Sequence, residues 1–103
     1  MYVQNSTFYP ALGKERDLLA HLEQWAKELQ ARGVPVALMH QLFNPDGPSF
    51  VSAVRYQDLG DFENHRRRWQ TDPTFQAHLA KAIALSKMAP TTELFEVSVP
   101  FPS

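Results

Sequence analysis

The sequence predicts an α+β fold in which a four-stranded antiparallel sheet carries two helices on one face, in the order β-α-β-β-α-β. Two stretches place apolar residues at spacings of three and four, which is typical of amphipathic helices. Four shorter stretches are rich in β-branched and aromatic residues, and Pro, Gly, Asn and Asp separate them. Short connections and right-handed crossovers then favour the ferredoxin-like arrangement. At 103 residues, of which 44% are apolar, we expect one domain over residues 1–103.

In the first half of the chain, a strand-like segment is followed by one with the apolar spacing of a helix. Residues 2–9 read as a strand because they are rich in β-branched and aromatic side chains. Residues 14–32 read as an amphipathic helix, which Gly33 ends. Its predicted buried stripe is Leu18, Leu22, Trp25, Ala26 and Leu29.

The second half contains a hairpin, an interrupted helix and a last strand. Residues 34–43 and 50–56 are predicted strands on either side of the turn 44–48, where Pro and Gly supply the special backbone angles. Asp58 is placed to cap the second helix, which we expect to pause at residues 71–73 and to end before Pro90. Residues 92–99 alternate apolar and polar side chains and form the fourth predicted strand.

The face of this sheet that carries no helix is predicted to be too apolar for water. Consecutive apolar residues on a strand point to opposite faces. Four such pairs occur in the predicted hairpin, namely Leu38-Met39, Leu42-Phe43, Phe50-Val51 and Ala53-Val54. Large exposed apolar patches are rare in monomers, so we expect a homodimer whose two sheets face each other about a two-fold axis and enclose a barrel.

One stretch of the chain resembles a known family. Residues 58–67 read D-L-x-x-x-E-x-x-R-R, and residues 72–79 read D-P-x-aromatic-Q-A-x-L. This pattern resembles that of NIPSNAP-like proteins. They belong to the dimeric α+β barrel superfamily, which also includes small antibiotic-biosynthesis-type monooxygenases. The resemblance implies a pocket between each sheet and its long helix, opening near the dimer interface.

The resemblance leaves the function open between three hypotheses, because members of this superfamily differ in activity. The first is a small-molecule-binding protein with an unknown ligand. The second is a cofactor-independent monooxygenase that acts on an aromatic or quinol-like substrate, as some members do. The third is an association module with a filled barrel. Whether the chain is an enzyme stays open, and we expect no cofactor under any of the three.

His40 and Arg55 are the candidate catalytic residues. If Leu42 opposes Val51 in the hairpin, His40 opposes Ala53 and Arg55 lies diagonally nearby. A buried histidine would serve as a base, and an arginine would hold a substrate anion. The alternatives are a histidine that merely lines the interface, and an arginine that is exposed or paired with Glu96.

Four further residues are candidates for ligand binding: Asn5, Tyr56, His65 and Trp69. Asn5 interrupts the apolar first strand, and a few polar groups in an apolar wall are typical of ligand pockets. Tyr56 neighbours Arg55, and His65 lies one helical turn before Trp69. The alternatives are a strand with one solvated face, a surface histidine and a tryptophan that packs in the core.

Heme, metal and nucleic-acid sites are not expected. Heme-degrading relatives combine an asparagine, a tryptophan and a histidine, which Asn5, Trp69 and His78 superficially match. The turn at residues 71–73 shifts Trp69, however, and His78 is expected to point outward because Leu79 points in. No histidine spacing suits zinc. A net charge of −1 predicts neither nucleic-acid nor membrane binding, and a start without a signal peptide predicts a cytoplasmic protein.

Overall fold

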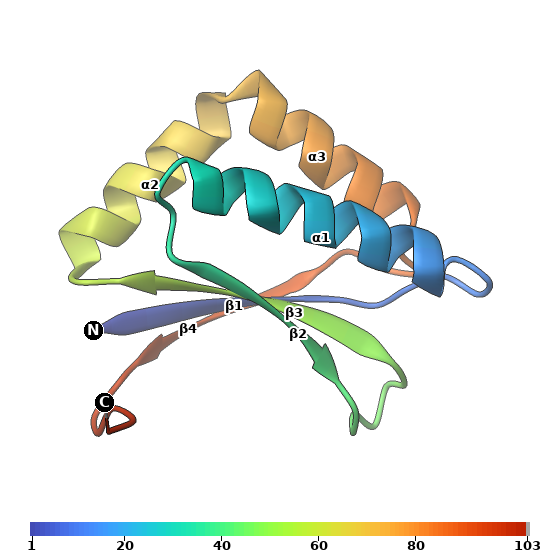
Figure 1. Ribbon diagram of the computed structural model, residues 1–103, viewed down its shortest axis with the longest axis horizontal. Helices are drawn as coiled ribbons and strands as arrows, with labels where there is room; N and C mark the ends of the chain where they lie inside the picture. Colours follow the sequence, from blue (N-terminus) through green and yellow to red (C-terminus); the bar gives the residue numbers. More distant parts are fainter. Residues whose placement is uncertain (103) are drawn as a thin grey trace.

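The computed structural model, which describes residues 1–102, confirms the predicted α+β fold. The strands β1 (Tyr2–Phe8), β2 (Val36–Gln41), β3 (Ser49–Tyr56) and β4 (Thr91–Glu96) form one antiparallel sheet in the order β2-β3-β1-β4. The helices are α1 (Glu15–Ala31), α2 (Leu59–Thr71) and α3 (Pro73–Ala84). All of them lie on one face of the sheet, and the other face carries no helix (Figure 1).

The β2–β3 hairpin is shorter than predicted. The ladder ends where Gln41 pairs with Ser49, so Leu42 and Phe43 belong to the connection and are exposed. A polar network closes the ladder at this point. Ser49 Oγ donates to Gln41 Oε1 at 2.8 Å, and Asn44 Nδ2 donates to the same oxygen at 3.0 Å. Side-chain bonds of this kind compete with further strand pairing.

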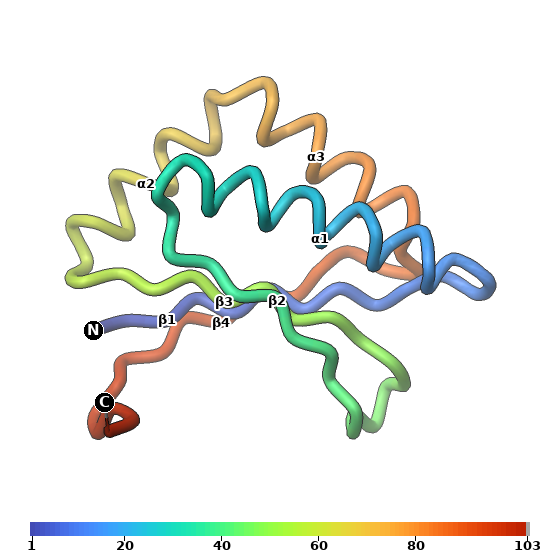
Figure 2. Tube along the Cα trace, viewed as in Figure 1, coloured from blue at the N-terminus to red at the C-terminus, as the bar shows by residue number. Residues whose placement is uncertain are grey.

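The predicted pause in the second helical stretch is confirmed as a full break. The Asp58 carboxylate caps α2 by accepting from the Asp61 backbone N–H at 2.7 Å. Asp72 ends α2 and caps α3, because its carboxylate accepts from the Thr74 backbone N–H at 2.9 Å. Pro73 occupies the first turn of α3, where its missing N–H costs nothing. The chain turns sharply between the two helices, so that together they arch over the sheet (Figure 2).

Strand alternation assigns each sheet residue to one face. The helix-covered face carries the even-numbered residues of β1, and their cross-strand partners share that face. These include Gln4, Ser6, Phe8, Leu38, Ser52, Val54 and Thr92. The open face carries the odd-numbered residues. They include Val3, Asn5, Ala37, Met39, Val51, Ala53, Arg55, Glu93 and Phe95.

The core lies between the helices and the covered face. Its buried residues are Phe8, Leu18, Leu22, Trp25, Phe50 and Ala82, with a second cluster of Val36, Val54 and Tyr56. Leu18, Leu22 and Trp25 belong to the stripe predicted from the sequence. Within residues 1–102, no helix is long and apolar enough to cross a membrane.

Candidate ligand cavity

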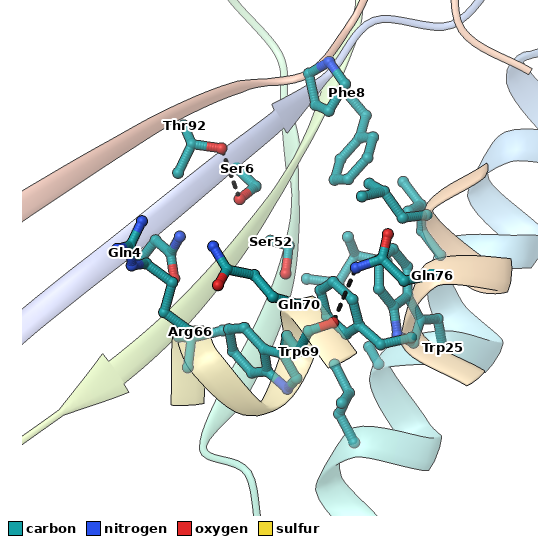
Figure 3. Close-up of a pocket in the computed structure, with 18 residues that line it drawn as sticks. Gln4, Ser6, Phe8, Trp25, Ser52, Arg66, Trp69, Gln70, Gln76 and Thr92 are labelled. Carbon is teal, nitrogen blue, oxygen red and sulfur yellow. Dashed lines mark hydrogen bonds between the residues drawn. The ribbon is translucent and has the colours of Figure 1, made fainter. Parts of the chain in front are cut away.

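A cavity of about 310 Å³ lies between the sheet and the three helices. Strands form its floor and helices its roof, and Figure 3 shows the side chains that line it. The floor includes Gln4, Ser6, Phe8 and Ser52, and the roof includes Trp25, Ala26, Arg66, Trp69, Phe75 and Leu79. A largely apolar wall with a few polar groups is the usual composition of a small-molecule site, and this volume is at the small end of that class.

The break between α2 and α3 builds the aromatic part of the wall. The rings of Trp69 and Phe75 stack with centroids 5.0 Å apart and an interplanar angle of 7°. In one continuous helix, residues six apart would point about 120° away from each other. The Asp72–Pro73 junction removes that constraint. Trp25 of α1 then meets the edge of Phe75 at 5.1 Å, so all three helices contribute a ring.

Tyr56 and Gln4 form a hydrogen-bonded pair at one end of the cavity. The Tyr56 hydroxyl donates to Gln4 Oε1 at 2.9 Å. Tyr56 is only 2% exposed, and this burial raises the pKa of its hydroxyl well above the usual range, with a smaller contribution from the negative charge of Asp61. The hydroxyl therefore stays protonated and remains a donor.

His65 packs against Tyr56 and does not line the 310 Å³ cavity. Its Nδ1 is 2.9 Å from the Asp61 backbone carbonyl and 3.2 Å from Asp61 Oδ1. Its ring is 5.3 Å from the Tyr56 ring and 5.6 Å from the Trp69 ring. Of the four predicted ligand-binding residues, the structure therefore brings Tyr56, His65 and Trp69 together, and only Trp69 lines the cavity itself.

The predicted register that paired His40 with Ala53 is wrong. His40 lies opposite Phe50, and Ala53 lies opposite Ala37, because the polar network at Gln41 and Ser49 closes the hairpin early. His40 is exposed on the side of the sheet that bears the helices, whereas Arg55 is exposed on the open face. The two do not form the combined site expected from the sequence, and neither lines the 310 Å³ cavity.

Asn5 also lies on the open face rather than in the cavity. It is opposite Ala53 on one side and Glu93 on the other. Its Oδ1 is shielded from solvent, yet it has no hydrogen-bond partner among residues 1–102. Unpaired buried polar atoms are rare and costly in folded proteins. Asn5 therefore places an unsatisfied acceptor on the open side of the sheet.

His78 does not point outward as expected. Its ring stacks on Trp25 at 5.5 Å, and its Nε2 lies 2.7 Å from Glu28 Oε2. His21 is buried beside it, with Nε2 2.8 Å from the His78 carbonyl oxygen. These contacts join α1 to α3. His21 lies one turn before Trp25 on the same stripe, which is the signal that could have identified it as buried.

Sequence reasoning did not identify Gln4 and Arg66 as cavity residues. The signal for Gln4 was present, since it alternates with Ser6 and Phe8 on the covered face. Arg66 stands in a run of three arginines, and only the helix register shows which of them faces the cavity. No cluster of His, Cys, Asp or Glu suited to a metal ion is found within residues 1–102.

Comparison with solved structures shows which proteins share this fold. An uncharacterized NIPSNAP domain protein from Burkholderia xenovorans superposes with a TM-score of 0.78 and 17% identity, over 100% of both chains. A provisionally assigned antibiotic biosynthesis monooxygenase from Deinococcus radiodurans gives a TM-score of 0.73 and 14% identity, over 100% of this chain and 98% of that one. A NIPSNAP family protein from Agrobacterium tumefaciens gives 0.69 and 17%, over 94% and 85%.

These neighbours confirm, at the level of the fold, the resemblance expected from the sequence. No protein-family model and no curated protein sequence matches the chain. Sequence identities this low support a shared fold but not a shared activity. The function must therefore be argued from the cavity.

Proposed function

We propose that this protein binds a small molecule in the cavity between its sheet and its helices, and that it works as a homodimer. The observation that carries the first part is the 310 Å³ cavity with its aromatic wall. A filled association module would have no such space. Arg66 is the only lining residue with an ionisable side chain, so the lining offers no general base, and binding is favoured over base-assisted oxygenation.

The two tryptophans make this proposal directly measurable. Trp25 and Trp69 are the only tryptophans of the chain, and both line the cavity. A bound molecule should therefore change the intrinsic fluorescence. Native mass spectrometry of protein purified from its host, together with fluorescence titration of aromatic and aliphatic probes, tests whether the cavity is occupied.

A cavity-filling substitution provides the matched test. Ala26 of α1 lines the cavity, whereas Ala20 of the same helix is exposed on its outer side. We expect Ala26→Phe to abolish binding of the ligand, whether it is retained from the host or added in a titration. Ala20→Phe should bind it as the wild type does. If both variants bind like the wild type, the ligand lies elsewhere and the proposed site is wrong.

The open face supports the homodimer. It combines apolar side chains on all four strands with a single cation, Arg55, and a single anion, Glu93. Neither charge forms an ion pair within residues 1–102. A face that is apolar, neutral overall and of mixed sign is complementary to a second copy of itself about a two-fold axis.

Two projecting segments frame this face. The β2–β3 connection and the segment after β4 both extend to the side away from the helices (Figure 1). Each carries unburied apolar side chains: Phe43 is 91% exposed in the first segment, and Phe101 is 98% exposed in the second. We expect sedimentation at micromolar concentration to show a dimer, and a stable monomer would overturn this part of the proposal.

A further inference from the structure

We infer that the ligand carries a carboxylate, bound by the free amide N–H groups of Gln4 and the guanidinium of Arg66 at one end of the cavity. This inference rests on the proposed function, since it names the chemical class of the molecule that the cavity takes. It follows from three observations on the cavity lining: the orientation of Gln4, the placement of Arg66 and the absence of any other charge among the lining residues.

The orientation of Gln4 is fixed by Tyr56. Because the protonated Tyr56 hydroxyl donates to Gln4 Oε1, the carbonyl side of the amide is already used. The other side is the Nε2 amide, which has no hydrogen-bond partner among residues 1–102. An unused pair of N–H donors in a cavity wall favours an oxygen acceptor on the ligand.

Arg66 lies at the same end of the cavity. Tyr2 is opposite Tyr56 and Gln4 is opposite Val54, so Gln4 occupies the part of the floor nearest Tyr56. The rings of His65 and Trp69 contact Tyr56, which places α2 above this part of the floor. Figure 3 draws the Arg66 side chain reaching toward Gln4, with Phe8 at the opposite end.

The guanidinium of Arg66 has donors to spare. Its ion pair joins Nε to Glu63 Oε1 at 3.6 Å on the helix surface, a long contact between two exposed side chains. Such surface pairs contribute little and are readily exchanged. A guanidinium presents five donors in a planar fork that matches a carboxylate, so Arg66 suits an anionic head better than a neutral one.

Apart from Arg66, the lining carries no charge, and its other polar side chains are neutral: Gln4, Ser6, Ser52, Gln70, Gln76 and Thr92. On the floor, the Ser6 and Thr92 hydroxyls lie 3.4 Å apart and share one hydrogen bond, and on the roof Gln76 Nε2 donates to the Trp69 carbonyl oxygen at 2.8 Å. The side chains of Ser52 and Gln70 form no hydrogen bond within residues 1–102, so they offer neutral contacts to the ligand. The far end is formed by Phe8, Leu22 and Trp25. The ligand class that fits is a small acid with one carboxylate and a largely apolar, aromatic-sized body.

An isosteric pair of probes tests this inference. 4-tert-Butylbenzoate and 4-tert-butylbenzamide share the same body and differ only in whether the head is an anion or a neutral amide. We expect tryptophan fluorescence of the wild-type protein to show tighter binding of the benzoate by about tenfold. Ala26→Phe should abolish binding of both probes, which locates them in the cavity.

Two substitutions separate the roles of the two residues. In Gln4→Glu, the carboxylate still accepts from the Tyr56 hydroxyl, but it offers no donor to the ligand, so the preference should reverse toward the benzamide. In Arg66→Met, the preference for the benzoate should shrink to near unity. Arg67→Met is the matched control, because Arg67 is exposed on the same helix and does not line the cavity.

The outcomes distinguish this inference from the proposed function. If neither probe binds the wild type, the cavity is not a binding site for such bodies and both statements fail. If both bind equally, or the benzamide binds more tightly, the cavity function stands and the carboxylate assignment is overturned. The assignment also fails if the wild-type preference persists in both Gln4→Glu and Arg66→Met.

Discussion

Gln4 and Asn5 are neighbours in β1, but they lie on opposite faces of the sheet and differ in their hydrogen bonding. On the covered face, Gln4 accepts a hydrogen bond from Tyr56 and keeps its amide N–H groups toward a cavity. On the open face, the Oδ1 of Asn5 is shielded from solvent and has no partner within residues 1–102. Between the covered face and the helices lies a cavity of about 310 Å³. Among the described residues, the open face carries no helix (Figure 1), and its Asn5 oxygen is left without a partner.

Because the two faces differ in this way, variants on each face should affect different properties of the protein. Substitutions on the open face should change association and leave the folded chain intact. Substitutions on the covered face should change stability or ligand binding and leave association intact.

A charge placed on the open face should weaken association more than any other change considered. In Val51→Lys, an ammonium group on a central strand would be buried between two sheets, which is strongly unfavourable. We expect the dimer dissociation constant to rise at least about 100-fold, or about 2.7 kcal/mol, by sedimentation. Met39→Lys, on the edge strand and exposed in the single chain, should act in the same direction.

The control for this prediction is Leu12→Lys. Leu12 is 101% exposed in the loop between β1 and α1 and belongs to neither face. Circular dichroism should show that all three variants remain folded. Unchanged association of Val51→Lys and Met39→Lys would mean that the open face is not the dimer interface.

The next effect is a pH dependence that belongs to the covered face. Because the pKa of Tyr56 is raised in the folded protein, the unfolded chain loses this proton first, from about pH 10 upward. The contribution of Tyr56 to stability is therefore full below pH 10 and is lost above it, by up to about 1.4 kcal/mol per pH unit.

Chemical denaturation at pH 8 to 11 measures this loss. Tyr56→Phe should reduce the fall in unfolding free energy above pH 10, whereas Tyr2→Phe, which leaves Tyr56 in place, should not. At neutral pH, Tyr56→Phe should cost about 1 kcal/mol through the lost bond to Gln4. Identical pH profiles for the wild type and Tyr56→Phe would contradict the assignment.

Reversing either of the two charges on the open face should weaken association more modestly. Arg55→Glu and Glu93→Arg should each weaken the dimer by about fivefold, roughly 1 kcal/mol, because like charges then meet across the two-fold axis. The double variant should restore most of the affinity. A double-mutant cycle by sedimentation at low salt measures this coupling, and purely additive losses would show that the two charges do not face each other.

The fold was predictable because its signals are local. Period and capping alone place α1 and the break at Asp72–Pro73 to within a residue or two. Hairpin length was not predictable in this way. Leu42 and Phe43 continue an apolar strand pattern, and the ladder nevertheless ends at Gln41 because three polar side chains hydrogen-bond there.

The candidate site was less predictable because it depends on strand register. His40 pairs with Phe50 instead of the predicted Ala53, which is a shift of three residues. Because neighbouring positions on a strand alternate faces, this shift puts His40 and Arg55 on opposite faces of the sheet. Trp69 could be found from helix period alone. Gln4 needed the face assignment of β1, and its role needed the contact with Tyr56, which lies 52 residues away in the chain.

The junction at Asp72 and Pro73 has a consequence for specificity. Neither residue lines the cavity, yet the angle between α2 and α3 sets where Trp69 and Phe75 stand above the floor. The distance between these two rings and the sheet is therefore set by residues outside the cavity lining. Two proteins with the same lining side chains would have cavities of different width if the angle at this junction differed. The lining residues alone therefore do not determine which ligand fits.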